Sequence, residues 1–338
     1  MTRRHRSSIL LSFLSPLILL ALLLSACGST STSGSASSTP GASTKSVSIG
    51  LGYVPDVQFA PFYVAQSKGY YSSAGLNVTF NHGIVPDLFG SMVSGKNNFV
   101  FAGGDELLQA RDKGIKAIDV ATIFQKYPVS LIVPADSSIK TLADLKGHSI
   151  GVPGMYGSTY TGLLALLYKA DLKLSDVHVQ SIGFTQVAAL VSRKVDAVMG
   201  YSNNEPLQLA QHGFAVRTFN VSDYQPLISN GIITTEDMYR NQPQVVRAFV
   251  QATLKGLKDV IADPSGALTI CKNYIPTLTD TAQALTVLKA TIPIWQGTNQ
   301  PGYNDSAAWQ SMEQFLVEQK MIKPVGNLAQ AYTNQAVS

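Results

Sequence analysis

Residues 196–206 carry the densest group of side chains that could recognise a small molecule. The stretch begins as a short apolar strand, breaks at Gly200 and ends at Pro206. The candidates for ligand contact lie between these two residues: Tyr201, Asn203, Asn204 and Glu205. Ligands of open α/β sheets bind at the carboxyl ends of strands, where a ring beside amides and a carboxylate could hold a flat, neutral molecule. The same pattern is typical of a helix start, with Asn or Glu as the cap and Pro206 in the first turn.

Three other loops follow predicted strands and carry side chains of the same kinds, at residues 53–59, 103–105 and 154–159. Their candidates for ligand contact are Tyr53, Asp56, Gln58, Phe59, Asp105, Tyr156, Ser158 and Thr159. Because strand ends gather at one edge of a sheet, we expect all four loops to converge on one cleft. Aromatic pairs gain about 0.5–1.5 kcal/mol beyond burial, so rings from different loops could clamp a planar ligand without charge.

The four loops contain no Arg or Lys, whereas phosphate and sulfonate sites usually recruit one of them. This absence favours a neutral ligand, although the helix start at 157–159 could still hold an anion through its backbone N–H groups. Each candidate ring could instead be a core residue, and two candidates have a specific structural alternative. Phe59 could seat the first helix in the core, and Asp105 could cap the helix that begins at Glu106.

The sequence gives little support for catalysis. Its five histidines are scattered, and it contains no nucleophile elbow, Walker loop or His-Glu-x-x-His zinc motif. Cys27 and Cys271 are its two cysteines, which leaves no Cys-based metal site. We therefore predict no catalytic residue, no metal site and no cofactor.

The charge balance argues against a nucleic-acid partner. The chain has 25 basic and 21 acidic residues, and three of the basic residues are arginines at positions 3, 4 and 6. Without these three the net charge is close to neutral, and no basic stripe of the kind that binds nucleic acid is present. We expect a small-molecule ligand instead.

Short apolar runs alternate with helical segments from residue 46 onward, a pattern typical of α/β folds with mostly parallel sheets. About 290 residues follow position 45, which is more than one core usually holds, so we expect two lobes. We assign 46–135 and 232–338 to lobe 1 and 136–231 to lobe 2. Two hinge segments would join them, near 133–137 and near 228–232.

The N-terminus looks like the leader of an exported protein. Three arginines precede an apolar run over 9–24, and Leu24-Ser25-Ala26-Cys27 resembles the lipobox of bacterial lipoproteins. The resemblance implies that residues 1–26 are a signal peptide and that Cys27 becomes an acylated membrane anchor. An ordinary secreted protein is the alternative. Eleven of the 18 residues at 28–45 are Ser or Thr, so we interpret 27–45 as the lipidated cysteine and a disordered tether.

The folded part resembles the solute-binding proteins of bacterial ABC importers, in the branch shared with thiamine-pyrimidine synthase and the aliphatic-sulfonate binders. The stretches that carry this resemblance are 53–56 (Tyr-Val-Pro-Asp), 62–71 (Phe-Tyr-Val-Ala-Gln-Ser-Lys-Gly-Tyr-Tyr), 75–78, 142–147 and 195–200. The resemblance implies a two-lobed periplasmic-binding-protein clamshell of type II. It also implies that the permease and ATPase subunits of an importer are the protein partners.

Within this branch, 57–63 and 201–206 look most like the riboflavin-binding lipoproteins, and the second stretch is also similar to the formylaminopyrimidine binders. The resemblance implies a lipid-anchored receptor on the extracytoplasmic face of the cell membrane that captures riboflavin. A thiamine-pyrimidine precursor and an aliphatic sulfonate are the alternative ligands. The chain lacks the cysteine cluster of the pyrimidine synthases, which argues against an enzyme.

Overall fold

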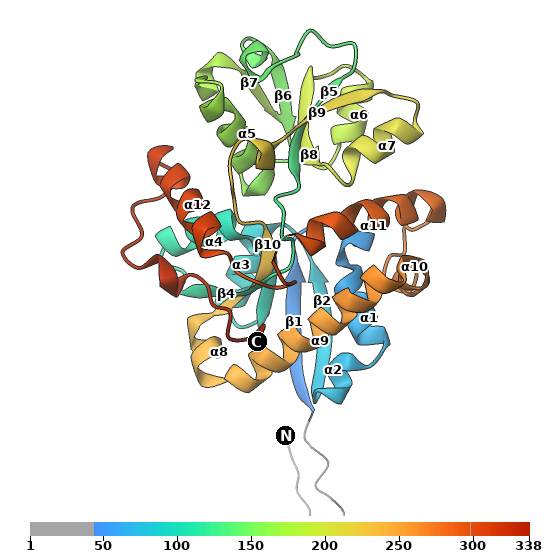
Figure 1. Cartoon of the computed structure of the whole chain (residues 1–338), viewed down its shortest axis with the longest axis vertical. Coiled ribbons are helices and arrows are strands. Elements are labelled where there is room, and N and C mark those ends of the chain that lie inside the picture. Colours follow the sequence, from blue (N-terminus) through green and yellow to red (C-terminus); the bar gives the residue numbers. More distant parts are fainter. Residues whose placement is uncertain (1–43, 298) are drawn as a thin grey trace, which may run out of the picture. The chain divides into compact units, whose positions relative to one another are not determined.

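The computed structural model of the chain describes residues 44–297 and 299–338. The predicted signal peptide, Cys27 and all but the last two residues of the predicted tether lie outside the described residues. Within the described ranges, none of the helices is long and apolar enough to cross a membrane. Two five-stranded sheets, each flanked by helices, organise this part of the chain (Figure 1).

The first sheet has the strand order β2-β1-β3-β10-β4. Strand β1 pairs in parallel with β2 and β3, whereas β10 runs antiparallel to β3 and β4. Four strands therefore share one direction. The strands are β1 (Lys45–Leu51), β2 (Leu76–His82), β3 (Phe99–Gly103), β4 (Ala117–Thr122) and β10 (Asn230–Thr235). Its helices are α1 (Ala60–Ser67), α2 (Tyr70–Ser73), α3 (Val85–Val93), α4 (Gly104–Asp112), α8 (Glu236–Asn241), α9 (Pro243–Ala262), α10 (Pro264–Cys271), α11 (Thr281–Gln296) and α12 (Ser306–Glu318).

The second sheet repeats this arrangement with the order β7-β6-β8-β5-β9. Strand β6 is parallel to β7 and β8, and β5 is antiparallel to β8 and β9. The strands are β5 (Val129–Pro134), β6 (Ser149–Val152), β7 (His178–Ser181), β8 (Ala197–Tyr201) and β9 (Val216–Asn220). Its helices are α5 (Gly157–Lys169), α6 (Gln186–Val191) and α7 (Glu205–Gln211). The two mostly parallel sheets confirm the predicted two-lobed α/β fold.

The chain crosses between the sheets twice, and one crossing differs from the prediction. Strand β5 pairs with β8 and β9, so the first crossing spans 123–128 and the predicted hinge at 133–137 is wrong. The predicted lobe boundary at 135–136 is therefore displaced by one strand. All six residues of β5 are buried, and an apolar run of this kind suits either sheet equally well. The second crossing spans 221–229, close to the predicted one.

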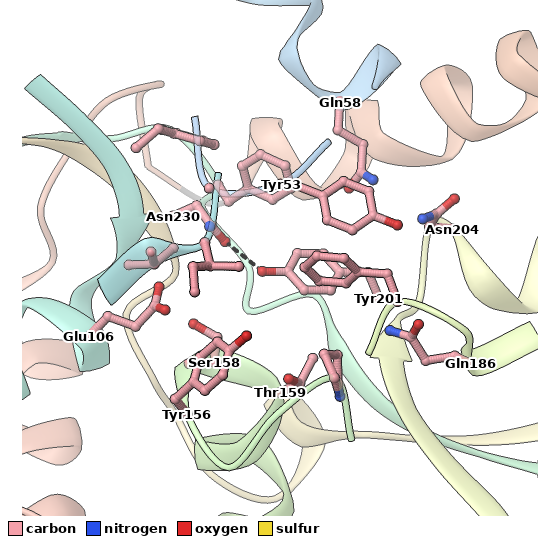
Figure 2. Close-up of a pocket in the computed structure, with 18 of the residues that line it drawn as sticks. Tyr53, Gln58, Glu106, Tyr156, Ser158, Thr159, Gln186, Tyr201, Asn204 and Asn230 are labelled. Atoms are coloured by element: carbon pink, nitrogen blue, oxygen red, sulfur yellow. Dashed lines mark hydrogen bonds between the residues drawn. The ribbon is translucent and has the colours of Figure 1, made fainter. Parts of the chain in front are cut away.

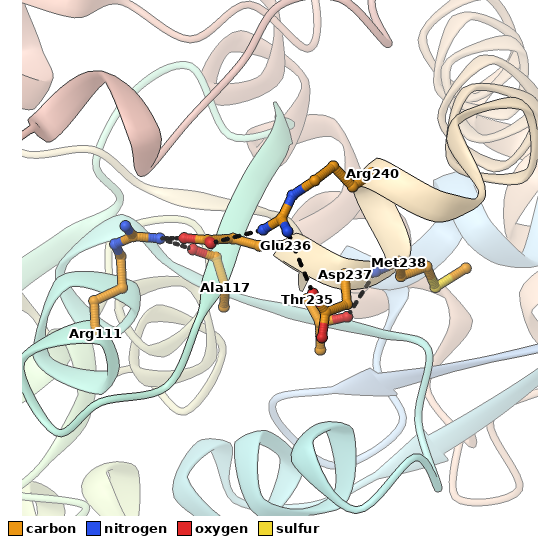
Figure 3. Close-up of polar contacts among 7 residues, drawn as sticks. All are labelled: Arg111, Ala117, Thr235, Glu236, Asp237, Met238 and Arg240. Carbon is orange, nitrogen blue, oxygen red and sulfur yellow. Dashed lines mark hydrogen bonds and ion pairs between the residues drawn. The ribbon is translucent and has the colours of Figure 1, made fainter.

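Helix α4 begins directly after β3, and its C-terminal end is held by charged groups (Figure 3). Arg111, in its last turn, donates to the carbonyl oxygen of Ala117 and forms an ion pair with Glu236 at 2.8 Å. Glu236 also pairs with Arg240 at 3.3 Å, one turn further along α8. The side chain of Thr235 caps α8 by accepting a hydrogen bond from the Met238 N–H. These contacts fix α4 against β4 and α8, and so fix the direction of its N-terminus.

The C-terminal segment covers the outer edge of β4. Unpaired backbone groups at this edge would otherwise be free to pair with a strand of another molecule. Asn304 is the centre of this contact. Its Oδ1 accepts hydrogen bonds from Thr122 at 2.8 Å and from the indole of Trp309 at 2.9 Å. Its Nδ2 donates to Asp119 Oδ1 at 3.1 Å. Asp119 is fully buried, and burial raises the pKa of its carboxyl from 3.8 to about 7.

Asp119→Asn is expected to flatten the pH dependence of stability. Between the unfolded and native pKa values the native state holds more protons than the unfolded chain, so the free energy of unfolding falls as pH rises from about 4 to 7, and most of this fall is seen between pH 5 and pH 8. Each pKa unit corresponds to about 1.4 kcal/mol. Between pH 5 and pH 8 the Tm of the wild type should fall by about 5 °C more than the Tm of the variant. Thermal melts at the two pH values measure this difference. The exposed Asp87→Asn is the control, and an equal change in both variants would contradict this assignment.

Candidate functional site

A cavity that is partly open to solvent lies between the two lobes (Figure 2). Its walls come from the segments after β1, β2, β3, β4, β6, β7 and β8 and from the start of β10. The predicted convergence of strand ends therefore occurs, with each lobe supplying part of the wall.

Nine of the twelve predicted site residues line this cavity. They are Tyr53, Gln58, Phe59, Tyr156, Ser158, Thr159, Tyr201, Asn204 and Glu205. Figure 2 shows Tyr53 and Gln58 from the first lobe on one side and Tyr156, Ser158 and Thr159 from the second lobe on the opposite side. The ring of Tyr201 lies between them, and its hydroxyl donates to Asn230 Oδ1 at 3.3 Å. Aromatic surface and neutral polar groups thus face the same space from both lobes.

The other three predicted residues, Asp56, Asp105 and Asn203, are absent from the cavity wall, and each positions a residue that belongs to it. Asp56 accepts from the Gln58 backbone N–H at 3.0 Å, which caps the short turn that carries Gln58. Asp105 accepts from the Ser158 hydroxyl at 2.9 Å. Asn203 Nδ2 donates to Gln58 Oε1 at 3.0 Å and to Thr291 Oγ1 at 2.7 Å. Asp105 and Asn203 link the lobes, because their partners lie in the opposite lobe.

The stretch 196–206 folds differently from the prediction in one respect. Strand β8 continues through Gly200 to Tyr201, and α7 begins at Glu205. Gly200 is required because a Cβ there would approach the Glu205 carboxyl to 2.9 Å. Glu205 Oε2 accepts from the Tyr201 N–H at 2.7 Å. The helix start exists, but its turn is closed by Glu205, while Asn203 binds the other lobe instead of capping.

The cavity is close to electrically neutral. Among the described residues that line it there is no Lys, Arg or His, and the two carboxyl groups are those of Glu106 and Glu205. Burial raises the pKa of Glu205 to about 7, and burial together with Asp105 raises that of Glu106 to about 8. Burial also raises the pKa of Tyr201, so its hydroxyl keeps its proton. Such a site suits a ligand without formal negative charge.

Three aromatic contacts shape the walls. Tyr53 meets Phe184 edge-to-face across the lobes, with ring centroids 4.8 Å apart and an interplanar angle of 85°. Phe59 packs against Phe101 and His82 at 6.0 and 5.4 Å. Phe59 therefore both seats the first helix and lines the cavity, so its two alternatives are compatible.

Several lining residues escaped the sequence analysis, among them Glu106, Phe184, Gln186 and Asn230. Phe184 follows a glycine after a strand, as Tyr201 does, and this pattern could have identified it. Glu106 sits beside a predicted candidate but was assigned to the helix alone. No sequence pattern identifies Asn230 as a site residue, because its place opposite Gly103 depends on the return crossing to the first sheet.

The two-lobed fold with a cavity between the lobes is shared with periplasmic binding proteins. A solved structure with the same fold is the periplasmic aliphatic sulphonate-binding protein SsuA of Escherichia coli. It aligns with a TM-score of 0.70 and 14% identity over 87% of this chain and 99% of that one. At this level of identity the likeness concerns the fold alone.

Sequence comparison defines the family. A family model described as NMT1/THI5 like matches residues 56–267. The riboflavin-binding protein RibY of Chloroflexus aurantiacus is 34% identical over 95% of this chain and 96% of its own length. The formylaminopyrimidine-binding protein of Halalkalibacterium halodurans is 27% identical over 67% of this chain and 69% of its own length. The chain belongs to the NMT1/THI5-like family.

Two adjacent asparagines allow the roles of bridging and lining to be separated. Both are buried, at 1% and 3% exposed, but Asn203 joins the lobes, whereas Asn204 lines the cavity and accepts a hydrogen bond from Gln208. Asn203→Ala leaves the buried side chains of Gln58 and Thr291 without their hydrogen-bond donor. It is therefore expected to lower the free energy of unfolding by about 1–3 kcal/mol. Asn204→Ala should cost at least about 1 kcal/mol less. Thermal or urea denaturation of both variants measures the difference, and equal losses would contradict the two roles.

Proposed function

We propose that this protein is the solute-binding component of an ABC importer and that it captures riboflavin between its lobes. The observation that carries the proposal is the neutral cavity with tyrosine rings from both lobes, at Tyr53, Tyr156 and Tyr201. A planar tricyclic ring system buries large apolar faces against such side chains. The similarity to RibY over nearly the whole chain supports this ligand.

The polar groups of the cavity suit the rest of riboflavin. The amides of Gln58, Gln186 and Asn204 can each donate and accept, which matches a ring edge that presents both N–H and carbonyl groups. Ser158 and Thr159 offer hydroxyl groups for the polyhydroxylated chain. A neutral ligand of this kind satisfies the walls without a charged partner.

Capture would work by closure of the lobes. The described conformation already has contacts across the cleft, including Asp105 with Ser158 and Tyr53 with Phe184. A ligand that touches both walls interacts with the closed arrangement more strongly than with an open one, so it shifts the population toward closure. The closed form would then be the one presented to the permease and ATPase subunits.

A sulfonate ligand fits the cavity poorly, although a sulfonate binder shares the fold. The N-terminus of α5 at Gly157 offers backbone N–H groups to an anion. Within the described part of the chain, however, the cavity wall contains no cationic side chain. Asp105 and Glu106 lie next to this helix start, and neither offers positive charge to an anion.

A thiamine-pyrimidine precursor is the second candidate. Glu205 lines the cavity and could accept hydrogen bonds from an exocyclic amine. The similarity to the formylaminopyrimidine-binding protein supports this possibility over a smaller share of the chain. An enzyme of pyrimidine synthesis is disfavoured because Cys271, the one cysteine in the described ranges, is buried outside the cavity wall.

We also propose that Cys27 carries a lipid anchor and that the protein works on the extracytoplasmic face of the cell membrane. The support is the lipobox-like sequence at 24–27 and the Ser/Thr-rich segment after it. Such a tether lets a binding protein remain near its permease while it samples the surroundings.

Binding to the protein should quench the fluorescence of riboflavin. The dissociation constant from this titration should lie in the micromolar range or below. Tyr156→Ala is expected to weaken this binding by about tenfold or more, because it removes a ring from one wall. Tyr224→Ala is the matched control, since both tyrosines are 39% exposed and Tyr224 lies outside the cavity wall.

Formylaminopyrimidine and an alkanesulfonate are titrated in parallel by calorimetry. Failure of riboflavin to bind at micromolar concentrations would overturn the proposed ligand.

A further inference from the structure

Glu106 reaches the cavity from the first turn of α4 (Figure 2). Its two carboxyl oxygens have different surroundings. Oε2 accepts a hydrogen bond from the Gly103 N–H at 2.8 Å. Oε1 lies toward Gly157 of the opposite lobe, where an added Cβ would stand 3.0 Å from it. The backbone contact therefore leaves Oε1 as the oxygen that faces the space between the lobes.

No ion pair of the described residues involves Glu106. The titratable groups around it are all acids: Asp105 on the same helix, Tyr127 on the first crossing, Tyr201 at the end of β8 and Tyr156 before α5. Burial and the neighbouring Asp105 raise the pKa of Glu106 to about 8. Near neutral pH the Asp105–Glu106 pair therefore keeps a proton that exposed carboxyl groups would lose.

We propose that Glu106 meets the ligand as a neutral carboxylic acid and donates a hydrogen bond from Oε1 to a carbonyl oxygen or an unprotonated ring nitrogen. This inference rests on the proposed function and adds a specificity determinant to it. The Gly103 N–H selects Oε2 as the carbonyl-like oxygen, so the proton resides on Oε1.

The cavity needs such a donor because neighbouring hydroxyls are already engaged. The Tyr201 hydroxyl donates to Asn230, and the Ser158 hydroxyl donates to Asp105. A buried ligand acceptor without a donor loses affinity. A ligand that places an N–H at this point would meet the Glu106 proton and be rejected. Glu106 would thus favour ring systems with carbonyl groups over those with amines at this position.

The proposal makes affinity pH-dependent in a defined direction. Above its pKa, Glu106 loses the donor and gains a negative charge, so binding weakens as pH rises. A group with a pKa of about 8 is protonated in roughly one molecule in eleven at pH 9, which predicts a dissociation constant about tenfold larger than at pH 6.5.

The first test measures riboflavin binding at pH 6.5 and 9 with the wild type, Glu106→Gln and Glu106→Leu. The amide of the Gln variant can accept from Gly103 and donates at every pH. The ratio of the two dissociation constants should be about tenfold smaller in Glu106→Gln than in the wild type, and this comparison cancels titration of Glu205 and of the ligand. Glu106→Leu should bind more weakly than Glu106→Gln at pH 6.5. Equal pH ratios in wild type and Gln variant, or a Gln variant as weak as the Leu variant, would overturn the proposal.

A second measurement follows the carboxyl ¹³C resonances of glutamate in the ligand-free protein, with Glu106→Gln identifying the signal. Titration of this signal near pH 8 supports the neutral acid, and titration near pH 4.5 overturns it whatever the ligand. If riboflavin fails to bind the wild type at both pH values, the proposed function fails and the donor to riboflavin fails with it. If riboflavin binds and the signal titrates near pH 4.5, the function stands and the role of Glu106 is refuted.

Discussion

The hydrogen bond between Asp105 and Ser158 joins the lobes beside the cavity, and much of the site depends on it. It brings the N-terminus of α4 against the N-terminus of α5, so that the first turns of helices from different lobes face each other. Gly103 permits this approach, because a Cβ there would lie 2.3 Å from Asp105 Oδ1 and 2.4 Å from Ser158 Oγ. Gly157 has a φ of 75°, and a Cβ there would stand 3.0 Å from Glu106 Oε1. Gly103 and Gly157 therefore allow polar groups of the two lobes to pack closely against each other.

This contact also sets the electrostatics of the cleft. Two helix N-termini would ordinarily favour an anion between them, since their N–H groups and dipoles point at the same space. Here the chain places its own acidic groups, Asp105 and Glu106, at that position. They occupy the donors that an anionic ligand would use, as the bond from the Gly103 N–H to Glu106 shows. This arrangement is in keeping with the uncharged ligand proposed above.

The sequence alone predicts which loops meet but not which side chain in each loop faces the ligand. Parallel strands force the loops after them to one edge, so the convergence of Tyr53, Tyr156 and Tyr201 follows from the strand pattern. Asn203 and Asn204 are neighbours of the same type, yet the turn after β8 directs one to the other lobe and one to the cavity. That direction depends on long-range partners. The position of β5 was missed for the same reason.

Asn203 shows how closure and recognition can be coupled through one buried group. Its amide binds Gln58 and Thr291 of the opposite lobe, and Gln58 itself lines the cavity. Any ligand that orders Gln58 also orders the acceptor of the bridge between lobes, so ligand contact and lobe contact stabilise each other. The same bridge is made of neutral amides and a hydroxyl, which pair without the desolvation cost of buried charges. A receptor built in this way can close tightly on an uncharged ligand, because neither the cavity walls nor the bridge through Asn203 depends on a charge supplied by that ligand.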